Sequence, residues 1–196
     1  MKTVGVILAG GRATRMGGGD KGALMLGGAS LLSRCIARLG PQVDAMVLNA
    51  NGDPARFEGF GLPVVADSVP GFVGPLAGVL AGMDWAASVG AEAVVSVAAD
   101  TPFFPLDLVQ RLRSEGDLVL AATPDPVRKL NRHPTFGLWP VGLRDDLRAA
   151  LDGGLRKVVL WTDRHDAGLA MFEATPFDPF FNINTPEDLV RAEGLL

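Results

Sequence analysis

Short apolar runs rich in β-branched residues alternate along the chain with longer segments whose apolar residues recur at helical spacing. The short runs predict strands at residues 3–8, 45–48, 63–66, 93–99 and 118–122. Strands that alternate with helices are typical of βαβ units and of a largely parallel sheet. The pattern therefore predicts an α/β fold.

Start and stop signals define the helices between these strands. Ser30 is expected to cap a helix that runs to Leu39 and stops at Gly40-Pro41. A second helix is predicted over residues 75–88 and a third from residue 105, because both begin with proline, which suits a first helical position. The final helix is expected to begin at residue 186, with Thr185 as its N-cap residue.

The second half of the chain has a less regular pattern. Residues 134–139 and 171–174 predict strands, residues 143–151 predict a helix, and residues 155–164 leave both possibilities open. No linker, charge block or internal repeat divides the chain. We therefore expect one domain over residues 1–196.

Composition and charge exclude several classes of protein. Hydrophobic residues make up 48% of the chain, close to the ~45–50% of globular proteins, so a sizeable core can form. A net charge of -4 disfavours a nucleic-acid partner. No run approaches the ~18 apolar residues of a membrane span, and residues 4–9 are too short for a signal peptide. We expect a cytoplasmic protein without a membrane partner.

The supply of metal ligands is also limited. Cys35 is the only cysteine, and His133 and His165 are the only histidines. An internal disulfide and a multi-cysteine zinc site are therefore excluded. Any metal is expected to be a hard cation held by oxygen atoms.

The segment from Leu8 to Lys21 follows the first predicted strand and is rich in glycine. Ligands of α/β sheets bind at the carboxyl ends of strands, and glycines let backbone amides approach an anion. Arg12, Arg15 and Lys21 stand there against one acid, Asp20, and this local positive charge suits a triphosphate. The segment is not a Walker A loop, because no Gly-Lys pair is followed by Ser or Thr, and a G-x-G-x-x-G match at residues 17–22 starts too far from the strand.

The same segment resembles the signature L-A-G-G-x-x-x-R-M-G-x-x-D-K of the molybdenum cofactor guanylyltransferases, a MobA-type family of nucleotidyltransferases. Further motifs follow in the family's order: Asn49-Ala50-Asn51, Asp67-Ser68, Gly74-Pro75-Leu76-Ala77-Gly78, Asp100-Thr101-Pro102, His133-Pro134-Thr135 and Asn182-Ile183-Asn184-Thr185-Pro186-Glu187. The resemblance covers nearly the whole chain. It implies a single-domain, Rossmann-like enzyme that joins GTP to the phosphate of the molybdenum–molybdopterin cofactor and releases pyrophosphate.

The residues themselves are consistent with this chemistry. A terminal phosphate with a second pKa near ~6 is already nucleophilic at neutral pH, so the reaction needs charge neutralisation rather than a general base. Asp100 follows an apolar strand and is expected to bind Mg²⁺, although Asp-x-Pro is equally common as a turn. Lys21 and Arg15 are the expected phosphate ligands. These three are the predicted catalytic residues.

The resemblance assigns the remaining site residues to two groups. It implies that the N-terminal part of the chain binds GTP and Mg²⁺ and that the C-terminal part faces the acceptor. Gly10 stands where cytidylyl and sugar-nucleotide relatives tend to have alanine, which favours guanine. Gly78 fits a close approach to the nucleotide or simple helix packing. The nucleotide-binding group comprises Leu8, Ala9, Gly10, Gly11, Lys21, Asn49, Asn51, Asp67, Gly78 and Asp100, and the acceptor group comprises Arg156, Asn182 and Asn184.

Other functions remain open. A molybdopterin cytidylyltransferase or a cobinamide-phosphate guanylyltransferase would use similar parts. A non-catalytic GTP-binding protein that delivers the cofactor is the alternative from a different class. The expected partners are GTP, the molybdenum cofactor and proteins of molybdoenzyme maturation.

Overall fold

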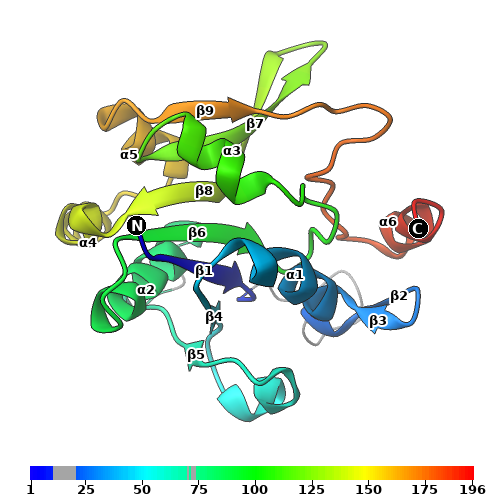
Figure 1. Cartoon of the computed structure of the whole chain (residues 1–196), viewed down its shortest axis with the longest axis horizontal. Helices are drawn as coiled ribbons and strands as arrows, with labels where there is room; N and C mark the ends of the chain where they lie inside the picture. Colours follow the sequence, from blue (N-terminus) through cyan, green and yellow to red (C-terminus); the bar gives the residue numbers. More distant parts are fainter. Residues whose placement is uncertain (11–20, 70, 72–73) are drawn as a thin grey trace.

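One mixed sheet organises the part of the chain that the computed structural model describes, which is residues 1–10, 21–69, 71 and 74–196. The strand order is β5-β4-β1-β6-β8-β7-β9. Figure 1 shows the strands stacked between helices on both faces. The strands are β1 (Thr3–Leu8), β4 (Ala45–Asn49), β5 (Val64–Val65), β6 (Ala93–Ala98), β7 (Val119–Asp125), β8 (Lys129–Pro140) and β9 (Gly168–Met171).

The direction of the strands divides this sheet into two parts. β5, β4, β1 and β6 are mutually parallel, as the alternation of strands and helices predicts. β8 runs antiparallel to both of its neighbours, and β9 is again parallel to β7. The expectation of a largely parallel α/β sheet is confirmed, and β8 is its antiparallel member.

Helices cover the two faces of the sheet with separate apolar cores. One core joins the sheet to α1 and α3, which lie in front of it in Figure 1, and the other joins it to α2, α4 and α5. A third, smaller cluster joins α6 to the hairpin β2–β3. The helices are α1 (Leu31–Leu39), α2 (Pro75–Ser88), α3 (Leu108–Ser114), α4 (Arg144–Asp152), α5 (Val158–Arg164) and α6 (Pro186–Glu193), and the hairpin strands are β2 (Met25–Leu26) and β3 (Ala29–Ser30). Short 3-10 turns occupy η2 (Lys21–Ala23), η3 (Gly40–Gln42), η4 (Pro54–Phe60) and η5 (Val141–Leu143).

Helices α1 and α6 begin where the sequence predicts, because a capping side chain bonds the first turn of each. The Ser30 hydroxyl accepts a hydrogen bond from the amide of Ser33 at 3.1 Å. Thr185 and Asp188 form a reciprocal capping box at the start of α6. In contrast, α3 begins at Leu108 rather than at residue 105, and Pro105 instead accepts the amide of Leu108 with its carbonyl.

The second half of the chain departs further from the predicted boundaries. The ambiguous residues 155–164 contain helix α5, and the last strand is Gly168–Met171 rather than residues 171–174. Gly168 explains the difference, because a Cβ there would lie 2.8 Å from the carbonyl oxygen of Glu115. A glycine is therefore required where this strand begins, although glycine weakens the pattern by which strands are recognised.

A bulge interrupts β8 where it passes the end of β6. Gly137 pairs with Leu120 on β7, but the next residue of β7, Ala121, pairs with His133. Residues 134–136 are thus extra in the ladder, and the pairing of β8 with β6 stops at Ser96. The last residues of β6 are left without β8 as a neighbour, and the edge of the sheet opens there.

Among the described residues, no helix combines the length and apolarity that a membrane crossing requires.

Candidate functional site

A cavity of about 330 Å³ opens at the carboxyl edge of the parallel strands. β1, β4 and β6 end there at Leu8, Asn49 and Ala98. This is where α/β sheets place their ligands. The residues that line the cavity are Leu8, Gly10, Asn49, Asn51, Asp67, Gly74, Pro75, Ala98, Asp100, Thr135 and Asn182.

One wall of the cavity is a hydrogen-bonded group centred on Asp67. Its Oδ1 accepts the Asn49 amide at 3.0 Å, and its Oδ2 accepts the Asn51 amide at 2.8 Å. The main-chain amide of Asp67 donates to Asn51 Oδ1 at 2.9 Å. Each carboxylate oxygen has two acceptor positions, so within the described part of the chain one position on each stays available to a ligand. The group therefore presents a fixed hydrogen-bond acceptor to the cavity.

The backbone next to β1 is only partly available to a ligand. The amide of Ala9 donates to the carbonyl of Asn49 at 2.9 Å, and the carbonyl of Leu8 accepts from Ala99 at 3.1 Å. Ala9 does not line the cavity, whereas Leu8 and Gly10 do. A Cβ added at Gly10 would meet no described atom within 4 Å. Close packing of the described protein therefore does not explain the glycine at this position, and a ligand at the edge of the cavity would.

Gly78 acts one layer beneath the cavity. A Cβ at this position of α2 would lie 2.2 Å from Asn49 Oδ1 and 2.8 Å from Leu8 Cδ2. The missing side chain lets α2 approach the ends of β4 and β1. Of the two readings of Gly78, the geometry supports helix packing, through which this residue positions Asn49.

A second wall joins Asp100 to the segment before α6. The buried Thr101 hydroxyl lies 3.2 Å from Asp100 Oδ1 and also contacts Asn182 Oδ1. The amide of Ile183 donates to the carbonyl of Asp100 at 2.9 Å. Residues 82 positions apart in the sequence are thereby held at one edge of the cavity.

The donor set on this wall fits a hard cation. Asp100 contributes a carboxylate and Asn182 an amide oxygen, and Mg²⁺ is typically held by one or two carboxylates together with substrate phosphates. No group of three or more His, Cys, Asp or Glu side chains suited to a metal occurs in the described part of the chain. Burial raises the pKa of the Cys35 thiol far above its usual range, and this thiol faces the carbonyl of Ala98 at 3.5 Å. The cysteine is therefore a neutral core residue rather than a ligand.

Several predicted site residues do not line the cavity or lie outside the described part of the chain. The Arg156 guanidinium donates to the carbonyls of Leu151 and Leu155 at 2.7 and 2.8 Å, so it caps the end of α4. The main-chain amide of Asn184 donates to Asp188 Oδ2 within the capping box of α6, and Asn184 is not among the residues that line the cavity. Gly11, Arg15 and the side chain of Lys21 lie outside the described part.

Thr135 lines the cavity and belongs to one of the family motifs, but it was not among the predicted site residues. It sits in the bulge of β8, and bulges often redirect side chains next to active sites. Pro134 was an available signal, because proline cannot donate to a strand ladder and is found in strands at edges or bulges. Gly74, Pro75 and Ala98 also line the cavity without having been predicted to do so.

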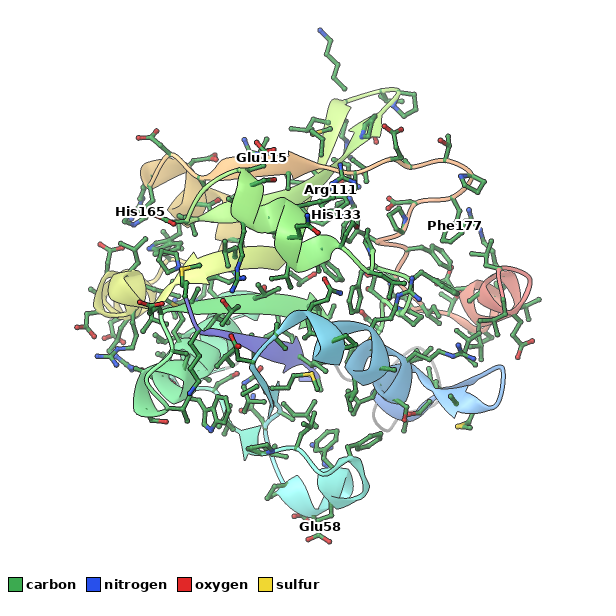
Figure 2. The ribbon with its side chains drawn as sticks, viewed as in Figure 1. Glu58, Arg111, Glu115, His133, His165 and Phe177 are labelled. Atoms are coloured by element: carbon green, nitrogen blue, oxygen red, sulfur yellow. The ribbon has the colours of Figure 1, made fainter. Side chains whose placement is uncertain are left out.

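His133 supports this bulge from inside the protein. Its imidazole Nε2 lies 2.9 Å from the Thr123 hydroxyl and its ring stacks on Phe180 with centroids 4.3 Å apart. Burial lowers the pKa of His133, so the ring is neutral at physiological pH. Figure 2 shows His133 well apart from His165, which lies at the end of α5. His133 is thus a structural residue that lies behind the bulge.

Comparisons with known proteins agree with this geometry. The family model of the MobA-like NTP transferase domain matches residues 5–167. A molybdenum cofactor guanylyltransferase of Bradyrhizobium sp. (strain ORS 278) is 53% identical over 97% of this chain and 92% of its own length, and one of Nitrobacter hamburgensis is 53% identical over 98% and 94%. The crystal structure of molybdopterin-guanine dinucleotide biosynthesis protein A from Archaeoglobus fulgidus is 25% identical, with a TM-score of 0.71 over 98% of this chain and 97% of its own. The chain therefore belongs to the family of MobA-like NTP transferases.

Proposed function

We propose that this nucleotidyltransferase transfers GMP from GTP to the phosphate of the molybdenum–molybdopterin cofactor. The observation that carries the proposal is that Asp67 and its two asparagines line the same cavity as Asp100 and Asn182. The names of the relatives that match nearly the full chain support the same reaction. One wall would bind the nucleotide and the other the reacting phosphates.

Guanine fits the Asp67 wall by its hydrogen-bonding groups. The base carries N–H donors on its pairing edge, and a carboxylate with unused acceptor positions is a suitable partner for them. Asn49 and Asn51 hold this carboxylate through their side-chain amides. Leu8 and Gly10 would contact the base or ribose, with Gly10 permitting the close approach.

The reacting phosphates would lie near Asp100. An oxygen of the acceptor phosphate attacks the α-phosphorus of GTP in line, the bond from that phosphorus to the β-phosphate oxygen breaks, and pyrophosphate leaves with the electron pair. Asp100, with the amide oxygen of Asn182 beside it, would hold Mg²⁺, which supplies positive charge to these phosphates when bound. We assign Lys21 and Arg15 to phosphate binding and Gly11 to backbone contact with the same anion.

The acceptor would approach from the side of the C-terminal segment. Asn182 lines the cavity there and Thr135 lines it from the bulge of β8. Arg156 and Asn184 would act at the rim rather than in the cavity, since neither is among the residues that line it. Residues from both halves of the chain thus meet at one reaction centre, with the product then passed to molybdoenzyme maturation in the cytoplasm.

Nucleotide selectivity provides the first test. A ligand that binds only the native state raises its stability by RT ln(1 + [L]/Kd). We expect GTP alone among the four nucleoside triphosphates to raise the melting temperature, and Mg²⁺ to enlarge the shift. A shift with CTP would favour a cytidylyltransferase. Turnover with cobinamide phosphate rather than molybdopterin would favour a cobinamide-phosphate guanylyltransferase. GTP binding without pyrophosphate release would favour a protein that delivers the cofactor.

Asp100→Asn tests the reaction itself. Loss of a charge that stabilises the transition state should lower kcat by about 100-fold or more, with the melting temperature little changed. Asp107→Asn is a matched control, because Asp107 lies in the loop after the same strand, is exposed and makes no side-chain cap bond. Full Mg²⁺-dependent activity of the Asp100 variant would reject the assignment.

A further inference from the structure

The loop that carries Asp67 joins β5 to α2 and makes part of the cavity wall. Asp67 lies at its start, and Gly74 and Pro75 line the cavity at its end. The asparagines of β4 and its following turn hold the carboxylate and the main-chain amide of Asp67. A second attachment at the neighbouring residue would help to keep Asp67 in one position.

Ser68 provides this second attachment. Its hydroxyl donates to Asp84 Oδ2 at 2.5 Å, which is the short distance typical of a hydrogen bond to a carboxylate. Asp84 lies on α2, beyond the helix start that lines the cavity. The bond thus ties the residue next to Asp67 to a rigid element of the fold.

Arginines of α4 hold the Asp84 carboxylate in turn. Arg148 Nη2 lies 2.7 Å from both of its oxygens, and Arg144 Nε lies 3.7 Å from Oδ1. The hydrogen bond to Asp84 raises the pKa of the Arg148 guanidinium. The side chain of Asp84 is about one-third exposed, so the arrangement acts through orientation more than through buried charge.

We propose that Asp84 is a positioning residue for nucleotide binding, which acts through the Ser68 hydroxyl to fix the loop that presents Asp67 to the cavity. This inference rests on the proposed function, because Asp67 is there assigned to the nucleotide. Arg148 keeps the Asp84 carboxylate aimed at Ser68. The interaction favours GTP binding and leaves the reacting phosphates on the second wall unaffected.

A double-mutant cycle tests the proposal. Ser68→Ala and Asp84→Ala should each raise the KM for GTP about five- to tenfold, with kcat at saturating GTP and the KM for the acceptor within about twofold. The double variant should be no worse than either single variant, because both remove the same bond. Ser68→Thr keeps the hydroxyl and should restore the KM. If Asp84→Ala does not fold, the Ser68 variants carry the test alone.

Matched controls separate positioning from general loss of stability. Ser88→Ala removes a hydroxyl that bonds the Trp85 carbonyl at the far end of α2, and Asp146→Ala removes a carboxylate that binds Trp161 and His165 from α4. Both controls should leave the KM for GTP unchanged. Hydrogen exchange of residues 67–69 should be faster in Ser68→Ala and Asp84→Ala than in wild type or either control.

The outcomes distinguish this inference from the proposed function. An active wild type whose KM for GTP is the same in Ser68→Ala would overturn the positioning role alone. Additive effects in the double variant, or a change confined to kcat or the acceptor, would also overturn it. A wild type that neither binds nor turns over GTP would overturn both the function and the role that depends on it.

Discussion

At the scale of single residues, existing hydrogen bonds decide which groups around the cavity can meet a ligand. The amide of Ala9 already donates to Asn49, and the Arg156 guanidinium already donates to two carbonyls of its own segment. Sequence motifs placed both residues near the nucleotide or the acceptor, but a motif does not show which of its donors the fold uses. By contrast, within the described part of the chain the Asp67 carboxylate keeps unused acceptor positions after binding both asparagines. We therefore expect Asp67 to contribute more to nucleotide selectivity than Ala9.

At the residue scale, we predict that the Thr135 hydroxyl contributes to binding of the acceptor. Thr135 lines the cavity from the β8 bulge, and Asn182 lines the same cavity. Thr135→Val preserves the shape and removes the hydroxyl, so the KM for the acceptor should rise about five- to tenfold if the hydroxyl bonds an acceptor phosphate. Steady-state kinetics with each substrate varied in turn would measure this.

Thr135→Ser is the matched control for this measurement. It keeps the hydroxyl, and both KM values should stay within about twofold of wild type. An equal rise in the KM for GTP and for the acceptor in Thr135→Val would contradict the assignment of Thr135 to the acceptor side.

At the scale of secondary-structure elements, the sequence predicted best where one residue imposes a local geometry. Ser30 and Thr185 bond backbone amides within their own turns, and both helix starts are confirmed. The β8 bulge and the start of β9 depend instead on contacts with distant segments, such as Gly168 against Glu115. A local pattern contains no information about such partners. Most of the parallel strands and their helices were therefore predictable from the sequence. The boundaries of the elements in the second half of the chain were not.

The site follows the same division. Leu8, Asn49 and Asp100 each follow an apolar strand, so the rule for carboxyl ends of parallel strands brings them to one cavity. Thr135 comes from the antiparallel strand, to which that rule does not apply. Asn182 was predicted as a site residue from the family motif alone. The hydrogen bond from the amide of Ile183 to the carbonyl of Asp100 is the physical reason why Asn182 lies at the cavity.

The capping box of α6 yields the prediction at this scale. Thr185 accepts the amide of Asp188 at 3.2 Å, and Asp188 Oδ2 accepts the amides of Asn184 and Thr185. Thr185→Ala should cost about 1 kcal/mol of unfolding free energy. For a chain of this size that corresponds to a melting temperature lower by about 2–4 °C, measured by calorimetry.

Thr185→Ser keeps the capping oxygen and should melt close to wild type. An unchanged melting temperature in Thr185→Ala would mean that the capping box contributes nothing to stability. The start of α6 would then have to be fixed by its packing against β2 and β3 alone.

At the scale of the whole molecule, the sheet separates two apolar cores and leaves the cavity at one edge. His133 stands in the first of these layers, where Phe180 stacks on it and Phe136 and Phe172 pack around Phe180. The same aromatic group supports the β8 bulge and the chain that leads to Asn182. Protonation of His133 would therefore place a charge inside the packing that forms one wall of the cavity.

This arrangement predicts a dependence of global stability on pH. Burial lowers the pKa of His133 in the folded protein, and the nearby Asp178 carboxylate offsets part of this effect. The unfolded chain, with a histidine pKa of ~6.5, then binds a proton at a pH where the folded protein does not. The stabilisation by neutral His133 is fully present above pH ~6.5 and is lost as the pH falls below it, by at most ~1.4 kcal/mol per pH unit.

Urea unfolding of wild type and His133→Gln at several values between pH 5 and 8 measures this contribution. Glutamine can still bond the Thr123 hydroxyl but does not titrate. The unfolding free energy of the His133→Gln protein should therefore fall less steeply below pH ~6.5 than that of wild type. Asp146, whose pKa is lowered by hydrogen bonds from Trp161 and His165, also reduces stability in acid, but it is present in both proteins and cancels in the difference. Parallel curves for the two proteins would mean that His133 titrates alike in the folded and unfolded chains. In that case its burial between β7, β8 and Phe180 would not control the acid stability of the cavity wall.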